Sequence, residues 1–266
     1  MASIVSTVPF PGRFASAPQV RTSRCQRSLQ TVDLGFEAGG KTILDKVSMT
    51  LSPSGLTVLL GPNGAGKSVF LRLANGLLLP TRGTVRWGDD RPTDATRLTQ
   101  SFVFQRPVLL RRSALDNVAF VLKLRGVAEA RGKARSLLDA AGLGALADRP
   151  ARVLSGGEQQ RLAIVRALAT GPGVLLLDEP TASLDPASVA AVEALIRSAE
   201  SQGVKVILVT HDVAQARRLA HDVVFLSGGV VREHTAAADF FLSPHSAEAR
   251  AYLDGRLIPQ EETNSC

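Results

Sequence analysis

The chain has 266 residues, of which 45% are hydrophobic and 21% charged, and a formal net charge of +7. This composition is that of a globular protein, and no run approaches the ~18 apolar residues that a membrane-spanning helix needs. Four arginines before the first acidic residue supply +4, which leaves 7 − 4 = +3 for the rest; they are Arg13, Arg21, Arg24 and Arg27. An excess of +3 is a weak argument for nucleic acid and equally fits work near anionic lipid head groups.

Residues 1–30 are rich in Ser, Ala, Pro and Arg and show no hydrophobic periodicity. They lack the apolar stretch of a secretory signal, so we expect a disordered N-terminal extension or a misassigned upstream start. An organelle transit peptide is the alternative, because the segment is rich in Arg and Ser and poor in acids. Cys25 and Cys266 lie in the terminal tails without metal-ligand spacing, which fits a reducing compartment and argues against a disulfide framework or a zinc site.

Strand and helix signals then alternate along the chain. Strands are predicted at 56–61, 83–88 and 101–105, the second as an edge strand of a hairpin, and a helix begins at Lys67. Between Pro107 and about Leu154 the pattern is helical, with segments at 113–124 and 128–142. Strand signals return at 174–178, 204–210 and 222–226. The alternation predicts a mostly parallel sheet covered on both faces, with a helical insert.

The segment "GPNGAGKS" fits the phosphate-loop motif G-x-x-x-x-G-K-[ST], between a buried strand and a helix. Its backbone would wrap a β-phosphate, with Lys67 reaching the β- and γ-phosphates and Ser68 contacting Mg²⁺. Val69 replaces a second hydroxyl that often contacts the α-phosphate, so nucleotide affinity is expected to be somewhat reduced. The nucleotide-binding residues are Gly61, Pro62, Asn63, Gly64, Ala65, Gly66, Lys67, Ser68 and Val69.

Polar residues end three of the predicted strands. Asp178 is placed to hold Mg²⁺, and Glu179 points to where water would attack the γ-phosphate; helix capping is the structural alternative for such an acid pair. His211 follows another buried strand on the same carboxyl edge of the sheet, where ligands of open α/β sheets bind. Gln105 occupies an equivalent position and could reach the metal or the water.

A second anion site is suggested by "LSGGEQQR", residues 154–161. A serine and two glycines open an amphipathic helix, and helix N-termini bind anions. The phosphate loop, about ninety residues earlier, already has its own helix N-terminus, so a second anion site is redundant within one chain.

With "GPNGAGKS", "VFQ", "LSGGEQQR", "VLLLDEP", "SLDP" and "VTHD" in this order, the chain resembles the ATP-binding subunit of an ABC transporter. The resemblance implies an α/β fold: a RecA-like P-loop NTPase core with an antiparallel β edge and an inserted α-helical subdomain at about 106–164. One ABC ATPase domain would span 31–258, followed by a tail at 259–266. Two copies would form a head-to-tail ATP-sandwich dimer, in which each signature helix completes the partner's site.

The resemblance also implies residue roles and cofactors, ATP and Mg²⁺. Catalytic roles fall to Glu179, His211, Gln105 and Lys67, and metal contacts to Ser68, Gln105 and Asp178. The signature residues that bind the partner's nucleotide are Ser155, Gly156 and Gly157, and Asp185 would contact the dimer partner. Ala38 stands where an aromatic side chain normally stacks on adenine, and Phe36, two residues earlier, is expected to pack into the core.

The segment 103–120 and the chain's ending are most similar to importer ATPases for oxyanions of the tungstate and phosphate type. The implied partners are a second copy, an integral membrane permease and a periplasmic substrate-binding protein, with no nucleic acid. Such a subunit lies peripherally on the cytoplasmic side of the inner membrane. An exporter ATPase and a soluble, non-transport ABC ATPase are the alternatives; the latter usually carry tandem domains, long coiled coils or zinc modules, which this chain lacks.

Overall fold

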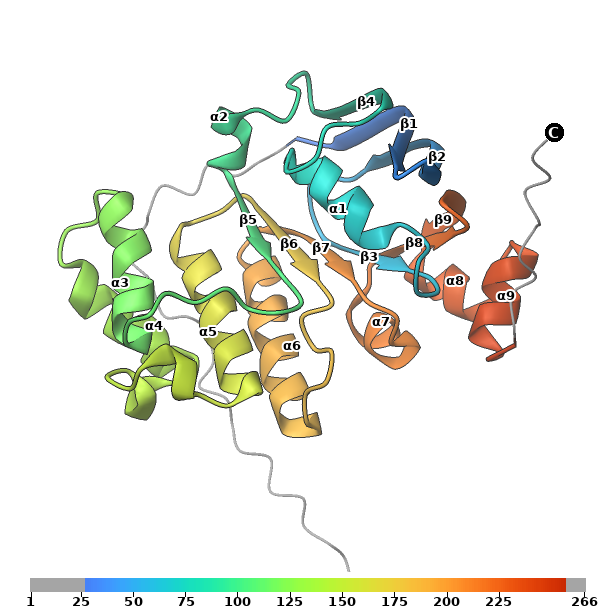
Figure 1. Ribbon diagram of the computed structural model, residues 1–266. Coiled ribbons are helices and arrows are strands. Elements are labelled where there is room, and N and C mark those ends of the chain that lie inside the picture. The colour runs from blue at the N-terminus through green and yellow to red at the C-terminus, as the bar shows by residue number, and fades with distance from the viewer. Residues whose placement is uncertain (1–26, 257–266) are drawn as a thin grey trace, which may run out of the picture.

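The computed structural model describes residues 27–256 (Figure 1). Its first strand, β1, begins at Leu29, two residues before the expected start of the domain. Most of the expected N-terminal extension, both cysteines and the 259–266 tail lie outside the described residues. Within residues 27–256, no helix has the length and apolar character needed to cross a membrane.

A six-stranded sheet runs through the middle of the molecule in the order β5-β6-β7-β3-β8-β9. Its strands are β3 (Leu56–Leu60), β5 (Gln100–Val103), β6 (Val174–Asp178), β7 (Lys205–Val209), β8 (Asp222–Ser227) and β9 (Val230–Ala236). The first five are parallel, which confirms the predicted sheet type. The unpredicted β9 returns antiparallel to β8 through a turn at Gly228 and Gly229, both of which have positive φ.

A separate three-stranded antiparallel sheet has the order β2-β1-β4. Its strands are β1 (Leu29–Ala38), β2 (Lys41–Leu51) and β4 (Arg82–Trp87). β4 is an edge strand as predicted, but the hairpin prediction for it is wrong, because β4 pairs with the distant β1. The indole Nε1 of Trp87 donates to the carbonyl of Ala74 at 2.8 Å, so the preceding helix anchors β4 in this place.

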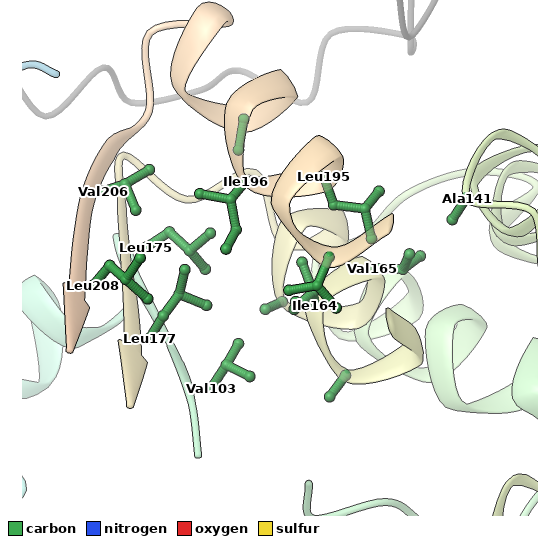
Figure 2. Close-up of a cluster of buried hydrophobic side chains, with 14 of the residues drawn as sticks. Val103, Ala141, Ile164, Val165, Leu175, Leu177, Leu195, Ile196, Val206 and Leu208 are labelled. Atoms are coloured by element: carbon green, nitrogen blue, oxygen red, sulfur yellow. The ribbon is translucent and has the colours of Figure 1, made fainter. Parts of the chain in front are cut away.

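Successive residues of the central strands point to opposite faces of the large sheet and enter two separate hydrophobic clusters. Leu175 and Leu177 belong to one cluster, and Leu176 between them belongs to the other. Helices α5 (Gly156–Ala169) and α6 (Pro186–Ser201) cover the first face, where Ile164 and Ile196 pack toward the strands (Figure 2). Helix α1 (Lys67–Asn75) and the small sheet cover the other face (Figure 1).

The two helices predicted between β5 and β6 are present as α3 (Ala114–Leu124) and α4 (Ala130–Ala140). They lie to one side of the large sheet, beyond β5 (Figure 1). Ser113 caps α3 by accepting a hydrogen bond from the backbone N–H of Asp116 at 3.0 Å. The remaining short elements are α2 (Asp94–Arg97), η1 (Gly144–Leu146), η2 (Ala151–Val153), α7 (Val213–Leu219), α8 (Ala237–Leu242) and α9 (Ala247–Leu253).

Candidate functional site

The phosphate loop joins β3 to α1, and its backbone conformation requires glycine at two positions. Gly61 has a φ of 148°, and a Cβ there would lie 2.0 Å from the carbonyl oxygen of Leu226. At Gly66, with a φ of 95°, a Cβ would lie 2.6 Å from the side chain of Leu44 and 2.9 Å from the carbonyl oxygen of Ile43. Neighbouring backbone therefore leaves no room for a side chain at either end of the loop.

Lys67, the first residue of α1, is buried inside the loop. Its Nζ donates to the carbonyls of Gly61 at 2.7 Å and Pro62 at 2.8 Å. Burial lowers the pKa of Lys67, against the opposing effect of the carboxylates of Glu179 and Asp178. The ammonium is thus held among polar atoms at the place where the motif predicts phosphate binding.

The expected metal contacts Ser68 and Asp178 lie side by side. The Ser68 hydroxyl donates to Asp178 Oδ1 at 2.6 Å, and an Arg72 nitrogen lies 3.7 Å from Asp178 Oδ2. Asp178 is 4% exposed, and burial raises its pKa, although Ser68 and Arg72 oppose this effect. A hydroxyl and a buried carboxylate are hard oxygen donors of the kind Mg²⁺ accepts, and Mg²⁺ takes its other ligands from water and phosphate. This donor set fits Mg²⁺, and the described residues hold no cluster of three or more His, Cys, Asp and Glu suited to another metal.

Glu179 brings together the ends of three neighbouring strands. Its Oε2 lies 3.2 Å from Nε2 of Gln105, which follows β5, and 3.3 Å from Nδ1 of His211, which follows β7. The backbone N–H of Glu179 donates to the carbonyl of Val209 at 3.0 Å, and its φ of 47° is unusual for a residue with a side chain. The polar strand ends predicted to share one edge of the sheet therefore meet around a single carboxylate.

The signature segment, residues 154–161, does not lie with Glu179, Gln105 and His211. In Figure 1 the N-terminus of α5 is at the lower edge of the molecule, away from the phosphate loop before α1. Ser155 and Glu158 form a capping box: the Ser155 Oγ accepts from the N–H of Glu158 at 3.3 Å, and Glu158 accepts from the N–H of Ser155 at 2.7 Å.

Gly156 and Gly157 were both expected to bind nucleotide, but they differ in exposure and in the space around them. Gly156 is exposed, and a Cβ there would meet its nearest atom, in the side chain of Leu184, at 3.9 Å. Gly157 is buried, and a Cβ there would lie 2.1 Å from Oγ and 2.6 Å from Cβ of Ser188 on α6. Gly157 therefore permits the close approach of α5 and α6, a packing requirement that the motif did not reveal. Asp185, the expected dimer contact, caps α6 by accepting from the N–H of Ser188 at 3.0 Å.

Two positions, Val69 and Ala38, depart from the usual residues of ABC ATPases. Val69 is half-buried and packs against the cluster between α1 and the sheet, which accounts for an apolar residue there. Phe36 packs against the same cluster, as expected. Ala38 is exposed at the end of β1, before a turn formed by Gly39 and Gly40.

One residue at the site was not predicted. The hydroxyl of Tyr252, on the C-terminal helix α9, donates to the backbone carbonyl of His211 at 2.9 Å and lies 3.4 Å from that of Gly61. No motif marks it, because the contacts join residues 41 and 191 positions apart. The signal available in the sequence was that Tyr252 is the single tyrosine of the chain and lies in a short helical segment.

Comparison with known families and proteins gives consistent results. The family described as ABC transporter matches residues 44–182. The tungstate uptake system ATP-binding protein TupC of Peptoclostridium acidaminophilum is 39% identical over 198 residues, covering 73% of this chain and 92% of that protein. The phosphate import ATP-binding protein PstB of Mycobacterium intracellulare is 39% identical over 244 residues, covering 85% of each chain.

Solved structures show the same architecture. The structure of cbiO1 from Clostridium perfringens, part of the ABC transporter complex cbiONQ, matches with a TM-score of 0.74 and 28% identity, covering 82% of this chain and 92% of that one. A dimeric ATP-binding cassette in a post-hydrolysis state, bound to ADP and Pi, matches with a TM-score of 0.71 and 30% identity, covering 79% of this chain and 98% of that one.

Proposed function

Because this chain belongs to the ABC transporter family and is an ATP-binding, ATP-hydrolysing subunit, we propose that it powers import of an oxyanion through a separate membrane permease. Tungstate and phosphate are the proposed cargo class. The support for import and for this class is the similarity to ATPases named for tungstate uptake and phosphate import. A periplasmic binding protein would deliver the anion, and the ATPase would work on the cytoplasmic side of the membrane.

The observation that carries the chemistry is the position of Glu179 between Gln105 and His211. In this proposal the Glu179 carboxylate polarises the water that attacks the γ-phosphate of ATP. His211 steadies the γ-phosphate, and Gln105 contacts the water or the metal. Their positions at adjacent strand ends would place all three side chains around one γ-phosphate and the water that attacks it.

Lys67 binds the β- and γ-phosphates by exchanging its bonds to the Gly61 and Pro62 carbonyls for bonds to phosphate oxygens. Ser68 and Asp178 would hold Mg²⁺, which when bound neutralises phosphate charge. Glycine backbone at both ends of the loop allows the close approach of the phosphates.

A second copy of the chain completes each site in this proposal. The exposed N-terminus of α5 presents Ser155 and Gly156 to the γ-phosphate held by the partner, where backbone N–H groups and the helix dipole favour an anion. Hydrolysis removes the bridging γ-phosphate, so the dimer opens and the permease relaxes. The apparent redundancy of two helix N-termini is resolved if each belongs to a different half of a shared site.

Glu179→Gln tests the assigned base. The amide keeps the size of the side chain but cannot polarise water as a carboxylate does, so the hydrolysis rate should fall by about 10²-fold or more. On size-exclusion chromatography with ATP, the variant should accumulate as a dimer. Glu129→Gln, a change at an exposed residue before α4, is the control and should hydrolyse ATP normally. Normal turnover by Glu179→Gln would show that the base lies elsewhere.

Uptake measurements test direction and cargo. In cells lacking this gene, tungsten or phosphate accumulation from dilute medium should fall, and the wild-type gene but not Glu179→Gln should restore it. A rise in cellular anion on deletion would instead indicate an exporter. Unchanged accumulation of both anions would contradict the proposed cargo class.

A further inference from the structure

The C-terminal helix α9 is fixed to the large sheet by charged and polar contacts at its N-terminal end. The Glu233 carboxylate, on β9, accepts from the backbone N–H groups of His245 at 3.1 Å and Ser246 at 2.9 Å. Ser246 then caps the helix by accepting from the N–H of Ala249 at 3.1 Å. Because β9 holds the two residues that precede the helix, α9 has a defined position relative to the strands that lead to the proposed catalytic residues.

Tyr252 lies on the last turn of α9 and its ring packs on the core. The ring centroid is 5.3 Å from that of Phe225, a fully buried residue of β8. This contact directs the hydroxyl toward the junction of two loops, the phosphate loop after β3 and the loop that carries His211 after β7. The hydroxyl reaches the His211 carbonyl at 2.9 Å and the Gly61 carbonyl at 3.4 Å.

A phenol carries a single donor hydrogen, so the shorter contact, to His211, is the main hydrogen bond. Burial raises the pKa of Tyr252 to about 12, and the carboxylates of Glu179 and Asp212 add to the effect. The hydroxyl therefore remains a donor at neutral pH. The second carbonyl, of Gly61, is also the acceptor for Lys67 Nζ at 2.7 Å, so Tyr252 lies beside an atom that positions the phosphate-binding lysine.

We infer that Tyr252 is a positioning residue for ATP hydrolysis: its hydroxyl fixes the backbone of His211 relative to the phosphate loop and so holds the imidazole beside Glu179. The inference rests on the proposed roles of His211 and Glu179. The imidazole of His211 is half exposed, with 52% of the side chain accessible, so its packing alone restrains it little. A bond to its carbonyl restrains the main chain from which the imidazole projects.

The decisive variant is Tyr252→Phe, which keeps the ring contact with Phe225 and removes the hydroxyl. Loss of one neutral hydrogen bond in the positioning of a catalytic group should lower kcat about three- to tenfold. The KM for ATP should stay within about twofold, because Lys67 and the phosphate-loop backbone are intact. The melting temperature should change little. Ser113→Ala is the matched control: it removes the equivalent cap from α3, which does not carry Tyr252, so it should lower the melting temperature and leave kcat unchanged.

A spectroscopic measurement separates positioning from a general effect on the helix. In ¹H–¹⁵N spectra of the full chain, Tyr252→Phe should shift the imidazole resonances of His211, assigned by their absence in His211→Gln. Those of His234, which pairs with Asp222 away from the site, should stay in place. Unmoved His211 resonances, or a kcat that falls only in proportion to lost stability, would overturn the inference. If Glu179→Gln also hydrolyses ATP normally, the proposed base fails as well; if only Tyr252→Phe behaves as wild type, the failure concerns Tyr252 alone.

Discussion

At the scale of single residues, Lys205 shows how a charge can be buried far from the catalytic edge. It begins β7, is 1% exposed, and its Nζ donates to the Ser54 carbonyl at 3.0 Å and to Thr57 Oγ1 at 2.7 Å. Thr57 in turn donates to Asp222 at 2.8 Å. Burial lowers the pKa of Lys205 to about 8, with Asp222 and Glu200 opposing the effect.

This burial predicts a pH dependence of stability. The pKa of Lys205 is about 8 in the folded protein and 10.5 in the unfolded chain, so between these values the unfolded state binds more protons. The free energy of unfolding should therefore rise with pH, by about 1 kcal/mol per unit from this group. Urea unfolding at pH 7.5 to 9.5 should show the rise in wild type, and Lys205→Met should flatten it. Equal slopes for the two proteins would rule out Lys205 as the source.

Ala38 gives a second prediction at this scale. The residue is exposed at the end of β1 and leaves the place of the usual adenine-stacking aromatic without a ring. Stacking of a base on an aromatic side chain contributes about 1–3 kcal/mol at nucleic-acid platforms. Ala38→Tyr should therefore tighten ATP binding roughly fivefold or more in a fluorescent-nucleotide titration, whereas Ala38→Leu, which adds volume without a ring of π-electrons, should not. Unchanged affinity in Ala38→Tyr would mean that the adenine lies elsewhere.

At the scale of elements, the proposed function requires two different things of the first turn of α5. In the proposed dimer its N-terminus is exposed to a partner's phosphate, while the side that faces α6 is buried. Each requirement is met by a different glycine: Gly156 is exposed, and Gly157 lies against Ser188. The capping box of Ser155 and Glu158, which flank the two glycines, stabilises this turn.

Gly157→Ala should separate α5 from α6. The added Cβ would lie 2.1 Å from Ser188 Oγ, and overpacking of this kind costs about 1–3 kcal/mol. The melting temperature should fall by several degrees, as calorimetry would show. Adding Ser188→Gly removes both atoms that clash and should restore most of the loss, whereas Gly156→Ala should change stability little. A Gly157→Ala protein as stable as wild type would mean that the helices move apart at no cost.

At the scale of the whole molecule, the two proposed half-sites of the chain lie in different places. The phosphate loop lies with Asp178, Glu179 and His211, and the signature helix begins at the other side of α6 (Figure 1). A monomer with this arrangement should bind ATP and hydrolyse it poorly. Hydrolysis should therefore rise more steeply than linearly with protein concentration.

Ser155→Arg tests this arrangement. A bulky cation at the start of α5 should block closure of the dimer and abolish hydrolysis, while ATP binding by the monomer stays largely intact. Because the change also removes a helix cap, Ser113→Arg is the matched control: Ser113 caps α3 in the same way but is not a proposed nucleotide contact. Equal losses of hydrolysis in the two variants would attribute the effect to capping rather than to the shared site.

The sequence by itself determined at which edge of the large sheet the polar side chains of the candidate site gather. Phosphate-loop spacing and polar residues after buried strands predicted that Lys67, Asp178, Glu179 and His211 lie at one edge of the sheet. The structure has them there, because parallel strands bring their carboxyl ends to one edge whatever the loops between them. Only the tertiary structure decided which distant segments touch. The pairing of β4 with β1, the approach of Gly157 to Ser188 and the bond from Tyr252 to His211 each depend on packing between segments distant in the chain. Such contacts leave no local periodicity or spacing, so residue order alone carries no sign of them.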